Sequence, residues 1–274
     1  MATSASWLSP LLMAAPVPIS SSFNASSRLQ RWFDAHLDGP GVWKWVHYFD
    51  VYDRHLARFR GTDVHFLEIG IFSGGSLRMW RDYLGESATI YGVDISSRTR
   101  AYHDSEKHGR PKIFVGDQTS AVFWDTFKAA VPRVDVMIDD GGHTMPMQRA
   151  TLEAMFDHLS FGGVYICEDL LGGDHQFWQV LFEKFVTAPA GLNRYGGHSR
   201  NRAWGQQRTV AELAIYPYMA VVEKLPSNRT EMIQVRHGTE WQPDRKFWYD
   251  MARSRTKVEK EGREVNAEPQ RNLV

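Results

Sequence analysis

One stretch of the sequence decides the fold: Val64-His65-Phe66-Leu67-Glu68-Ile69-Gly70-Ile71-Phe72-Ser73-Gly74-Gly75-Ser76. It opens with a short apolar run that predicts a buried strand, and its glycines predict a tight turn into a helix. Such a strand-turn-helix unit is typical of α/β folds that bind ligands at the carboxyl ends of their strands. A dinucleotide fingerprint beginning at Gly70 would need glycine two residues later, where the sequence has Phe72. The turn therefore argues against NAD or FAD.

The alternation of short apolar runs and helical patterns continues along the chain. After the first strand at 64–67, it predicts strands at 89–93, 112–115, 134–138 and 164–167, and helices at 76–84, 121–130 and 148–159. This order predicts βαβ units and a mostly parallel sheet. The later runs 214–222 and 232–235 predict an antiparallel pair that closes one edge. We therefore expect a doubly wound α/β fold with a seven-stranded sheet.

The two ends of the chain differ in composition from its middle. Residues 1–28 are rich in Ser, Pro and Ala and predict a disordered leader, with a secretory signal as the alternative. Residues 29–60 are aromatic-rich and predict a helical cap on a single domain that spans 29–252. Residues 253–274 are charged and poor in apolar side chains, which predicts a flexible tail.

The composition narrows the classes of partner. Lys and Arg together number 32, as do Asp and Glu, so the net charge is zero and nothing favours nucleic acid. Arginines between residues 193 and 208 predict either a mobile loop or an anion-binding lid. No apolar run reaches about 18 residues, so we expect no membrane span. Cys167 is the only cysteine, which excludes an internal disulfide and favours a cytoplasmic location.

Polar residues follow the first three predicted strands, where a ligand would bind. Gly70, Ser73 and Gly74 lie in the glycine-rich turn, which lets backbone approach a ligand closely. Asp94 ends the second strand about 20 residues beyond this turn, a position that suits a ribose diol or, alternatively, a cap of the next turn. After the third strand, the polar pair Asp117-Gln118 would either contact the edge of an adenine or form an ordinary turn.

Two pairs of carboxylates follow the fourth and fifth predicted strands. One is Asp139-Asp140, ahead of Gly141-Gly142-His143, and the other is Glu168-Asp169. If these strands are neighbours, their ends lie roughly 5 Å apart, and such crowding is unfavourable unless protons or a cation relieve it. Oxygen ligands of this kind suit Mg²⁺, Mn²⁺ or Ca²⁺ rather than Zn²⁺. The alternative is helix capping together with exposed turn acids.

The histidine that follows the first acidic pair is a candidate base. His143 lies three residues beyond Asp140. A lone histidine in a loop is usually polar surface. Beside a metal and a polarised hydroxyl, it would instead be a natural general base, because its unperturbed pKa of about 6.5 suits neutral pH.

These motifs resemble those of the macrocin and mycinamicin sugar O-methyltransferases. The similarity is carried by Phe66-Leu67-Glu68-Ile69-Gly70, Gly74-Gly75-Ser76-Leu77-Arg78-Met79-Trp80, Gly92-Val93-Asp94-Ile95, Ile138-Asp139-Asp140-Gly141-Gly142-His143 and Gly162-Gly163-Val164-Tyr165-Ile166-Cys167-Glu168-Asp169. The novobiocin sugar methyltransferase and the cephalosporin-hydroxylase-like proteins belong to the same wider set. The resemblance covers about residues 45–236, and the acidic motifs are its most specific part.

The resemblance implies an enzyme that uses S-adenosylmethionine and a divalent metal, Mg²⁺ or Mn²⁺. It assigns the metal to Asp140, Glu168 and Asp169, and the role of catalytic base to His143. It places Glu68, Gly70, Asp94 and Asp117 at cofactor-binding positions, to which we add Ser73, Gly74, Gln118 and Asp139. The implied acceptor is a hydroxyl, on a glycosylated small molecule of natural product biosynthesis.

Several alternatives stay open at this point. Gly142 departs from the macrolide enzymes, which carry serine there, so the acceptor and any assembly into a homo-oligomer cannot be carried over from the family. A metal-dependent oxygenase, as the hydroxylase label suggests, is a second function. Carboxylate ligands do not favour it, because the usual iron site has two histidines and one carboxylate. A third is an inactive cofactor-binding module.

Overall fold

The structure is a computed structural model, and it describes residues 27–170, 177–187 and 210–227. The predicted leader lies almost wholly outside the described residues, and the arginine-containing loop, the run 232–235 and the tail lie outside them entirely. The predicted domain limits at 29 and 252 stay predictions. Among the described helices, none combines the length and apolarity that a membrane crossing requires.

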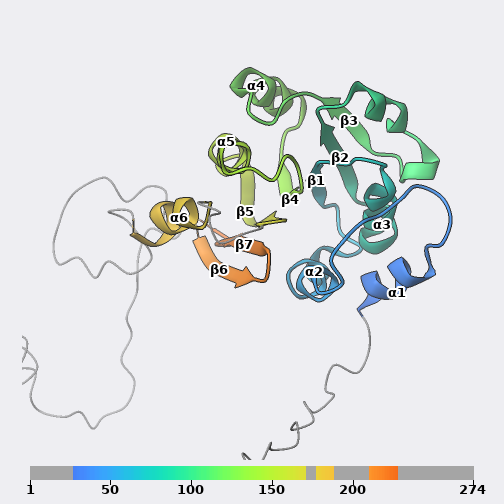
Figure 1. The fold of residues 1–274 in the computed structure, drawn as a ribbon, viewed down its shortest axis with the longest axis horizontal. Coiled ribbons are helices and arrows are strands. Elements are labelled where there is room, and N and C mark those ends of the chain that lie inside the picture. Colours follow the sequence, from blue (N-terminus) through green and yellow to red (C-terminus); the bar gives the residue numbers. More distant parts are fainter. Residues whose placement is uncertain (1–26, 171–176, 188–209, 228–274) are drawn as a thin grey trace, which may run out of the picture. The chain divides into compact units, whose positions relative to one another are not determined.

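The strands of the described chain form one sheet in the order β3-β2-β1-β4-β5-β7-β6 (Figure 1). They are β1 (His65–Ile69), β2 (Thr89–Asp94), β3 (Lys112–Val115), β4 (Val134–Asp139), β5 (Leu159–Cys167), β6 (Val210–Tyr216) and β7 (Met219–Lys224). The first five strands pair in parallel, while β7 is antiparallel to both β5 and β6. The predicted seven-stranded, mostly parallel sheet with an antiparallel pair is confirmed.

Helices cover both faces of this sheet (Figure 1). One face carries α1 (Arg28–Ala35), α2 (Tyr48–Leu56) and α3 (Gly75–Leu84), and the other carries α4 (Ala121–Ala130), α5 (Met145–Met155) and α6 (Phe177–Phe182). Short 3₁₀ helices are η1 (Ala57–Phe59), η2 (Ser97–Tyr102) and η3 (Glu106–His108), and η4 (Glu183–Thr187) is a short π-helix. Serine side chains cap α1 and α4, where Ser27 accepts from the N–H of Gln30 and Ser120 from that of Phe123.

Alternate residues of each central strand enter different cores. In β1, Phe66 packs with the helices α1 to α3, whereas Leu67 and Ile69 pack with α4 to α6. In β4, Ile138 packs with α1 to α3, and Met137 packs with α4 to α6. Because successive side chains of a strand point to opposite faces, a strand that is buried on both faces reads as a continuous apolar run. This is why the strands were visible in the sequence.

The order of the strands creates a crevice at one edge. From β1 the chain adds β2 and β3 on one side, and then returns to add β4 and β5 on the other. The connections therefore diverge between β1 and β4. In an open parallel sheet, ligands bind outside the carboxyl ends of the strands at such a point.

Three predicted elements differ from the structure. The helix predicted at 148–159 is α5, which begins earlier because Pro146 fits the first turn of a helix, and it ends at Met155. The strand predicted at 164–167 begins at Leu159, which pairs with Val134. The run 214–222 is a hairpin rather than one strand, because the chain turns between β6 and β7 at Pro217 and Tyr218.

Candidate active site

A cavity of about 920 Å³ occupies the crevice at the carboxyl ends of the strands. Each of the five parallel strands contributes to its lining through the residue at its end or just beyond it, namely Gly70, Asp94, Gly116, Asp140 and Glu168. The cavity also borders the segment that precedes α2. Among the residues predicted as site residues, the lining includes Gly70, Ser73, Asp94, Asp117, Gln118, Asp140, His143, Glu168 and Asp169.

The glycine-rich turn after β1 is built for close contact. Gly70 has a φ of 83°, and a Cβ there would overlap the carbonyl oxygen of Asp140, so only glycine fits. Gly74 is left-handed at the start of α3, and its Cβ would overlap the rings of His108 and Tyr102. The turn therefore packs directly against the acidic motif, and Gly74 lies behind the cavity rather than in its lining.

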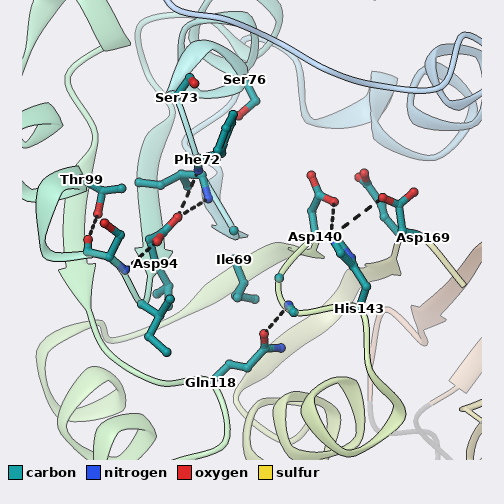
Figure 2. A pocket seen from close by; sticks show the side chains of 18 of the residues that line it. Ile69, Phe72, Ser73, Ser76, Asp94, Thr99, Gln118, Asp140, His143 and Asp169 are labelled. Atoms are coloured by element: carbon teal, nitrogen blue, oxygen red, sulfur yellow. Dashed lines mark hydrogen bonds and ion pairs between the residues drawn. The ribbon is translucent and has the colours of Figure 1, made fainter.

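Asp94 is held in place by the turn that it faces. Its Oδ2 accepts from the backbone N–H groups of Ile71 and Phe72, each at 3.1 Å, and its Oδ1 accepts from that of Ser96 at 2.8 Å (Figure 2). A carboxylate has about four acceptor positions, so these bonds leave capacity for a ligand in the cavity. The arrangement fits both of the interpretations made from the sequence, a ribose contact and a turn cap.

Glu68 lies within β1, on the face that carries α3. Its carboxylate is buried and accepts from Ser76 Oγ at 2.7 Å and Trp80 Nε1 at 3.2 Å. Burial raises the pKa of Glu68, and Lys44 opposes this rise. The structure thus places this predicted cofactor residue behind the cavity wall.

The polar residues after β3 connect it to the acidic motif. Gln118 is buried, and its amide donates to Asp139 Oδ1 at 3.1 Å while it accepts from the Gly142 N–H at 2.7 Å. Asp139 lies beneath this turn, outside the cavity lining, and burial raises its pKa to about 7. Asp117 is exposed, and hydrogen bonds from Thr119 lower its pKa. Gln118 therefore braces the turn that carries Asp140.

Asp140, Glu168 and Asp169 form an acidic rim at the carboxyl ends of β4 and β5. Two of these carboxylates, those of Asp140 and Asp169, lie close to His143. Asp140 Oδ1 and Asp169 Oδ2 lie 4.0 Å and 3.9 Å from His143 Nε2 (Figure 2). One potential ligand atom from each of Asp140, His143 and Asp169 lies within 4.8 Å of the others. Two carboxylates and an imidazole in this arrangement fit a divalent ion. Glu168 is not part of this set of three, although it lines the cavity beside it.

Two residues at this rim have strained backbone conformations. His143 and Asp169 both adopt left-handed conformations, with φ of 54° and 53°. Phe72, in the turn across the cavity, has a φ of 39° and a side chain that is 80% exposed. Non-glycine residues in this region cost about 1–3 kcal/mol each and cluster at functional sites. The strained residues line the cavity from both sides.

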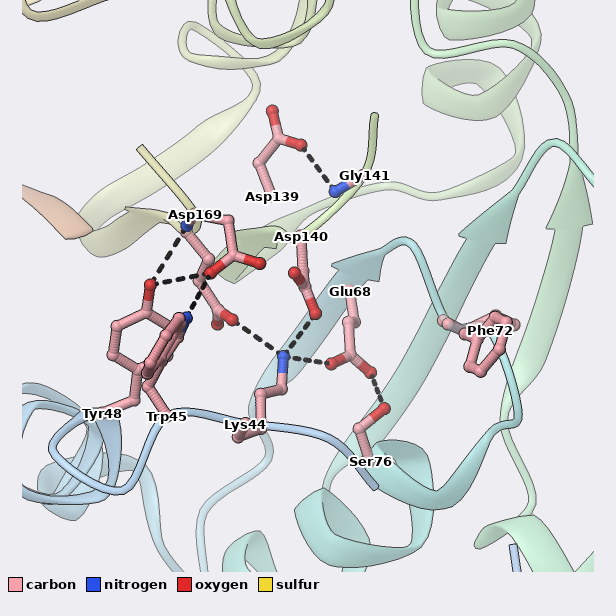
Figure 3. A network of polar contacts seen from close by, with 12 residues as sticks. Lys44, Trp45, Tyr48, Glu68, Phe72, Ser76, Asp139, Asp140, Gly141 and Asp169 are labelled. Atoms are coloured by element: carbon pink, nitrogen blue, oxygen red, sulfur yellow. Dashed lines mark hydrogen bonds and ion pairs between the residues drawn. The ribbon is translucent and has the colours of Figure 1, made fainter. Parts of the chain in front are cut away.

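The segment before α2 supplies a residue that the sequence interpretation missed. Lys44 Nζ lies 2.6 Å from Asp140 Oδ2, 2.8 Å from Glu168 Oε2 and 3.6 Å from Glu68 Oε1, and its side chain is only 3% exposed (Figure 3). Burial by itself would lower the pKa of Lys44, but the nearby carboxylates raise it well above its usual range. A single lysine between Trp43 and Trp45 was the only signal in the sequence.

Neighbours of Lys44 bind two further carboxylate oxygens of the acidic rim. Asp169 Oδ1 accepts from Trp45 Nε1 at 3.1 Å and from the Tyr48 hydroxyl at 3.0 Å (Figure 3). Glu168 Oε1 accepts from the Tyr52 hydroxyl at 2.5 Å, while burial raises the pKa of Glu168 to about 8 and Lys44 opposes the rise. Residues 44–52 therefore donate at least one hydrogen bond to each of Asp140, Glu168 and Asp169.

Comparisons with known proteins agree with this architecture. A family model described as a methyltransferase domain matches residues 67–170. The 8-demethyl-8-alpha-L-rhamnosyl tetracenomycin-C 2'-O-methyltransferase of Streptomyces olivaceus is 30% identical over 205 residues, which are 68% of this chain and 52% of that protein. The demethylmacrocin O-methyltransferase of Streptomyces fradiae is 36% identical over 136 residues, 47% of this chain and 33% of that protein. The chain thus spans about half or less of the length of these curated relatives.

Among solved structures, the MycE methyltransferase of the mycinamycin biosynthetic pathway, in complex with Mg, SAH and mycinamycin VI, is similar to this chain. The TM-score is 0.56 at 27% sequence identity, over 76% of this chain and 55% of that one. The residues that match the methyltransferase family model run from within β1 to just beyond β5, and they include the glycine turn, Asp94 and both acidic pairs. In its sheet order and its motifs, the chain is therefore similar to the macrocin and mycinamicin sugar O-methyltransferases, and its residues 67–170 match a methyltransferase domain.

Proposed function

We propose that this protein transfers a methyl group from S-adenosylmethionine to a hydroxyl, with Mg²⁺ or Mn²⁺ at the acidic rim. One observation carries the proposal: Asp140, His143 and Asp169 converge at one end of the cavity whose other end is formed by Asp94 and the glycine turn. Donor and acceptor sites in one cavity are what group transfer requires, since much of the rate comes from holding the reactants together.

The roles of the side chains follow from their places around the cavity. Asp94 would hold the ribose of the cofactor, and Asp140 and Asp169, with Glu168 beside them, would hold the metal. When bound, the cofactor supplies a methyl group on a sulfonium, and the metal acidifies the hydroxyl that it coordinates. His143 would accept the proton of that hydroxyl at Nε2, since a base must lie within hydrogen-bonding reach of the proton that it removes.

The acceptor is proposed from the names of the relatives. The two Streptomyces enzymes are named for the methylation of a rhamnosyl tetracenomycin and of demethylmacrocin, and the MycE complex contains mycinamycin VI. We therefore propose a hydroxyl of a glycosylated natural product, with no nucleic acid or membrane involved. The aromatic side chains of Trp43, Trp45 and Tyr48 line the cavity near the acidic rim and would exclude water around such an acceptor. We also propose a cytoplasmic location.

The test has two stages. Thermal shift with S-adenosylhomocysteine, with and without Mg²⁺, should show stabilisation by the nucleoside, as ligand binding to the folded state requires. An oxygenase would not respond to the nucleoside. Incubation with radiolabelled S-adenosylmethionine and an extract of the native source should then yield a labelled product, whose mass and fragmentation identify the acceptor. Binding without turnover would leave the inactive module as the function.

A further inference from the structure

Residues 41–52, here called the strap, cross the acidic rim and donate to all three of its carboxylates. Lys44 binds Asp140 and Glu168, Trp45 and Tyr48 bind Asp169, and Tyr52 binds Glu168. The strap therefore touches the same carboxyl groups that the proposed function assigns to the metal, and the role inferred for it rests on that proposed function.

The strap is fixed at both ends. A Cβ at Gly75, the first residue of α3, would overlap the carbonyl oxygens of Pro40 and Gly41, so the strap begins in direct backbone contact with α3. At its other end, Tyr48 begins α2, and Tyr52 packs edge to face against Trp80 at 5.0 Å. Between these anchors, residues 41–47 belong to no helix or strand. Lys44 thus sits on a short connection outside any helix or strand, between these two anchors.

The ammonium group occupies a particular place within the rim. Its nitrogen bridges one oxygen of Asp140, which follows β4, and one oxygen of Glu168, which follows β5, at 2.6 Å and 2.8 Å. A divalent ion that used these same two oxygens would occupy this position, at a shorter distance of about 2.0–2.1 Å for Mg²⁺. Two cations cannot share this position.

Electrostatics acts in the same direction as the steric argument. A unit charge and a divalent charge about 4 Å apart repel one another even in a water-like medium, and more strongly in a buried site. Lys44 is almost completely buried, so solvent screens this repulsion poorly. Metal binding would be favoured by withdrawal of the ammonium group, whichever carboxylates complete the coordination.

We propose that Lys44 is an internal competitor of the catalytic metal: its ammonium group bridges Asp140 and Glu168 until the divalent ion displaces it from these two carboxylates. The strap carries Trp43 and Trp45, which line the cavity, so the exchange couples metal loading to the shape of the acceptor end. In the metal-free protein, Lys44 neutralises carboxylates that would otherwise repel one another.

The reactivity of the Lys44 amine measures this exchange in the unmodified full chain. Acetylation by an N-hydroxysuccinimide ester, followed by peptide mass spectrometry, is compared with and without saturating Mg²⁺. We expect labelling of Lys44 to increase at least several-fold with Mg²⁺. Two internal controls should not change: Lys128, which is part-exposed on α4, and Lys224, which is buried and donates to the carbonyls of Phe156 and Leu159. Unchanged or reduced labelling of Lys44 in the metal-bound protein overturns the proposal.

A direct measurement of metal affinity gives a second, independent outcome. By calorimetry with Mn²⁺, Lys44→Met should bind at least about tenfold more tightly than wild type, because the competing charge is gone. Lys44→Arg, which keeps the charge, should not bind more tightly, and Lys128→Met should match wild type. Weaker or unchanged binding by a folded Lys44→Met protein contradicts competition. If wild type binds no Mn²⁺ at all, the metal part of the proposed function fails as well, whereas Mn²⁺ binding without these changes removes only the role of Lys44.

Discussion

The two ends of the cavity are held together by different kinds of contact. At the cofactor end, Asp94 accepts from Ile71, Phe72 and Ser96, so its partners belong to the glycine turn and to the residues that follow β2. At the acidic end, the partners of Asp140, Glu168 and Asp169 come from residues 44–52, far away in the sequence. A turn motif can be recognised together with its partners, but a carboxylate that is satisfied by a distant segment looks the same in the sequence as an unsatisfied one.

The comparison also separates two kinds of electrostatic environment. Asp94 is bound by backbone N–H groups, which are neutral donors of fixed orientation. At the acidic rim, a buried lysine instead lies close to the carboxylates of Asp140 and Glu168, and near that of Glu68 behind them. Removing one partner of a buried charge network is usually far more disruptive than removing one neutral hydrogen bond. Substitutions at the two ends should therefore differ in size and in the ligand that they affect.

The largest effect is expected at the acidic end, for the rate rather than for binding. His143→Ala should lower kcat by roughly 10²–10⁴-fold, the usual contribution of a positioned base. Its affinity for Mn²⁺ and for S-adenosylhomocysteine should stay near that of wild type, as calorimetry would show. Residual activity should increase with pH, because hydroxide can replace the base. Loss of metal affinity in place of rate would make His143 a ligand, which its approach to Asp140 and Asp169 also permits.

The next effect is on the metal alone. Asp140→Asn should weaken Mn²⁺ binding by about 100-fold or more, since even the partners of metal ligands are worth about 10–100-fold. Excess Mg²⁺ should partly restore turnover, and the affinity for S-adenosylhomocysteine should be unaffected. Asp157→Asn, at an exposed position, is the matched control. Equal loss of nucleoside affinity in Asp140→Asn would show that the two ends of the cavity are not independent.

A smaller effect is expected at the cofactor end. Asp94→Ala should reduce the affinity for S-adenosylhomocysteine by roughly tenfold or more, as expected for the loss of charged hydrogen bonds worth about 1.5–3 kcal/mol. Mn²⁺ affinity should be retained. Because Asp94 also holds the glycine turn, the melting temperature must be measured in parallel. A lower melting temperature with unchanged nucleoside affinity would reduce Asp94 to a support of the turn.

The smallest effect is expected for a substitution outside the cavity, and it serves as a reference for the other three. Glu223 accepts from His55 Nδ1 at 2.6 Å and from Arg58 at 2.9 Å. Burial would raise the pKa of Glu223, but the bonds from His55 and Arg58 lower it from 4.5 to about 2. A depressed pKa stabilises the fold above pH 4.5, and this contribution is lost as the pH falls toward 2.

Glu223→Gln should therefore lower the free energy of unfolding by roughly 1–3 kcal/mol at pH 7. Urea unfolding at pH 7, 4 and 3 should show that the difference from wild type shrinks as the pH falls. Binding of Mn²⁺ and nucleoside at pH 7 should be unchanged. A difference that grows toward low pH would mean that the carboxylate of Glu223 is not the stabilising group.

Much of the fold could be predicted because its local signals agree with one another. Strands buried on both faces appear as apolar runs, and the strand predicted at 112–115 and the helix predicted at 121–130 coincide with β3 and α4. The limits of α5 and β5 were missed, since helical and strand patterns overlap where one element leads directly into the other. The hairpin at Pro217 was missed because the apolar run continues through its turn.

Within the site, the sequence by itself determined which residue types lie at the ends of the strands. Because the strands are parallel, their carboxyl ends lie at one edge of the sheet, and Asp94, Asp140, His143 and Asp169 therefore line one cavity. The sequence did not determine which way each side chain points. Asp139 and Asp140 are adjacent, yet one is buried beneath the turn and the other faces Lys44, because neighbouring side chains at a strand end project to opposite sides.

Only the tertiary structure decided what neutralises the acidic rim. Lys44 is separated from Asp140 and Glu168 by most of the sheet-forming sequence, and no spacing rule connects them. Lys44 reaches these carboxylates only because the strap is held in place at both ends. Its first residues contact the backbone of Gly75 in α3, and Tyr52 at its other end packs on Trp80. Local patterns specify elements and their ends, whereas the pairing of buried charges is a property of packing between segments that are distant in the chain.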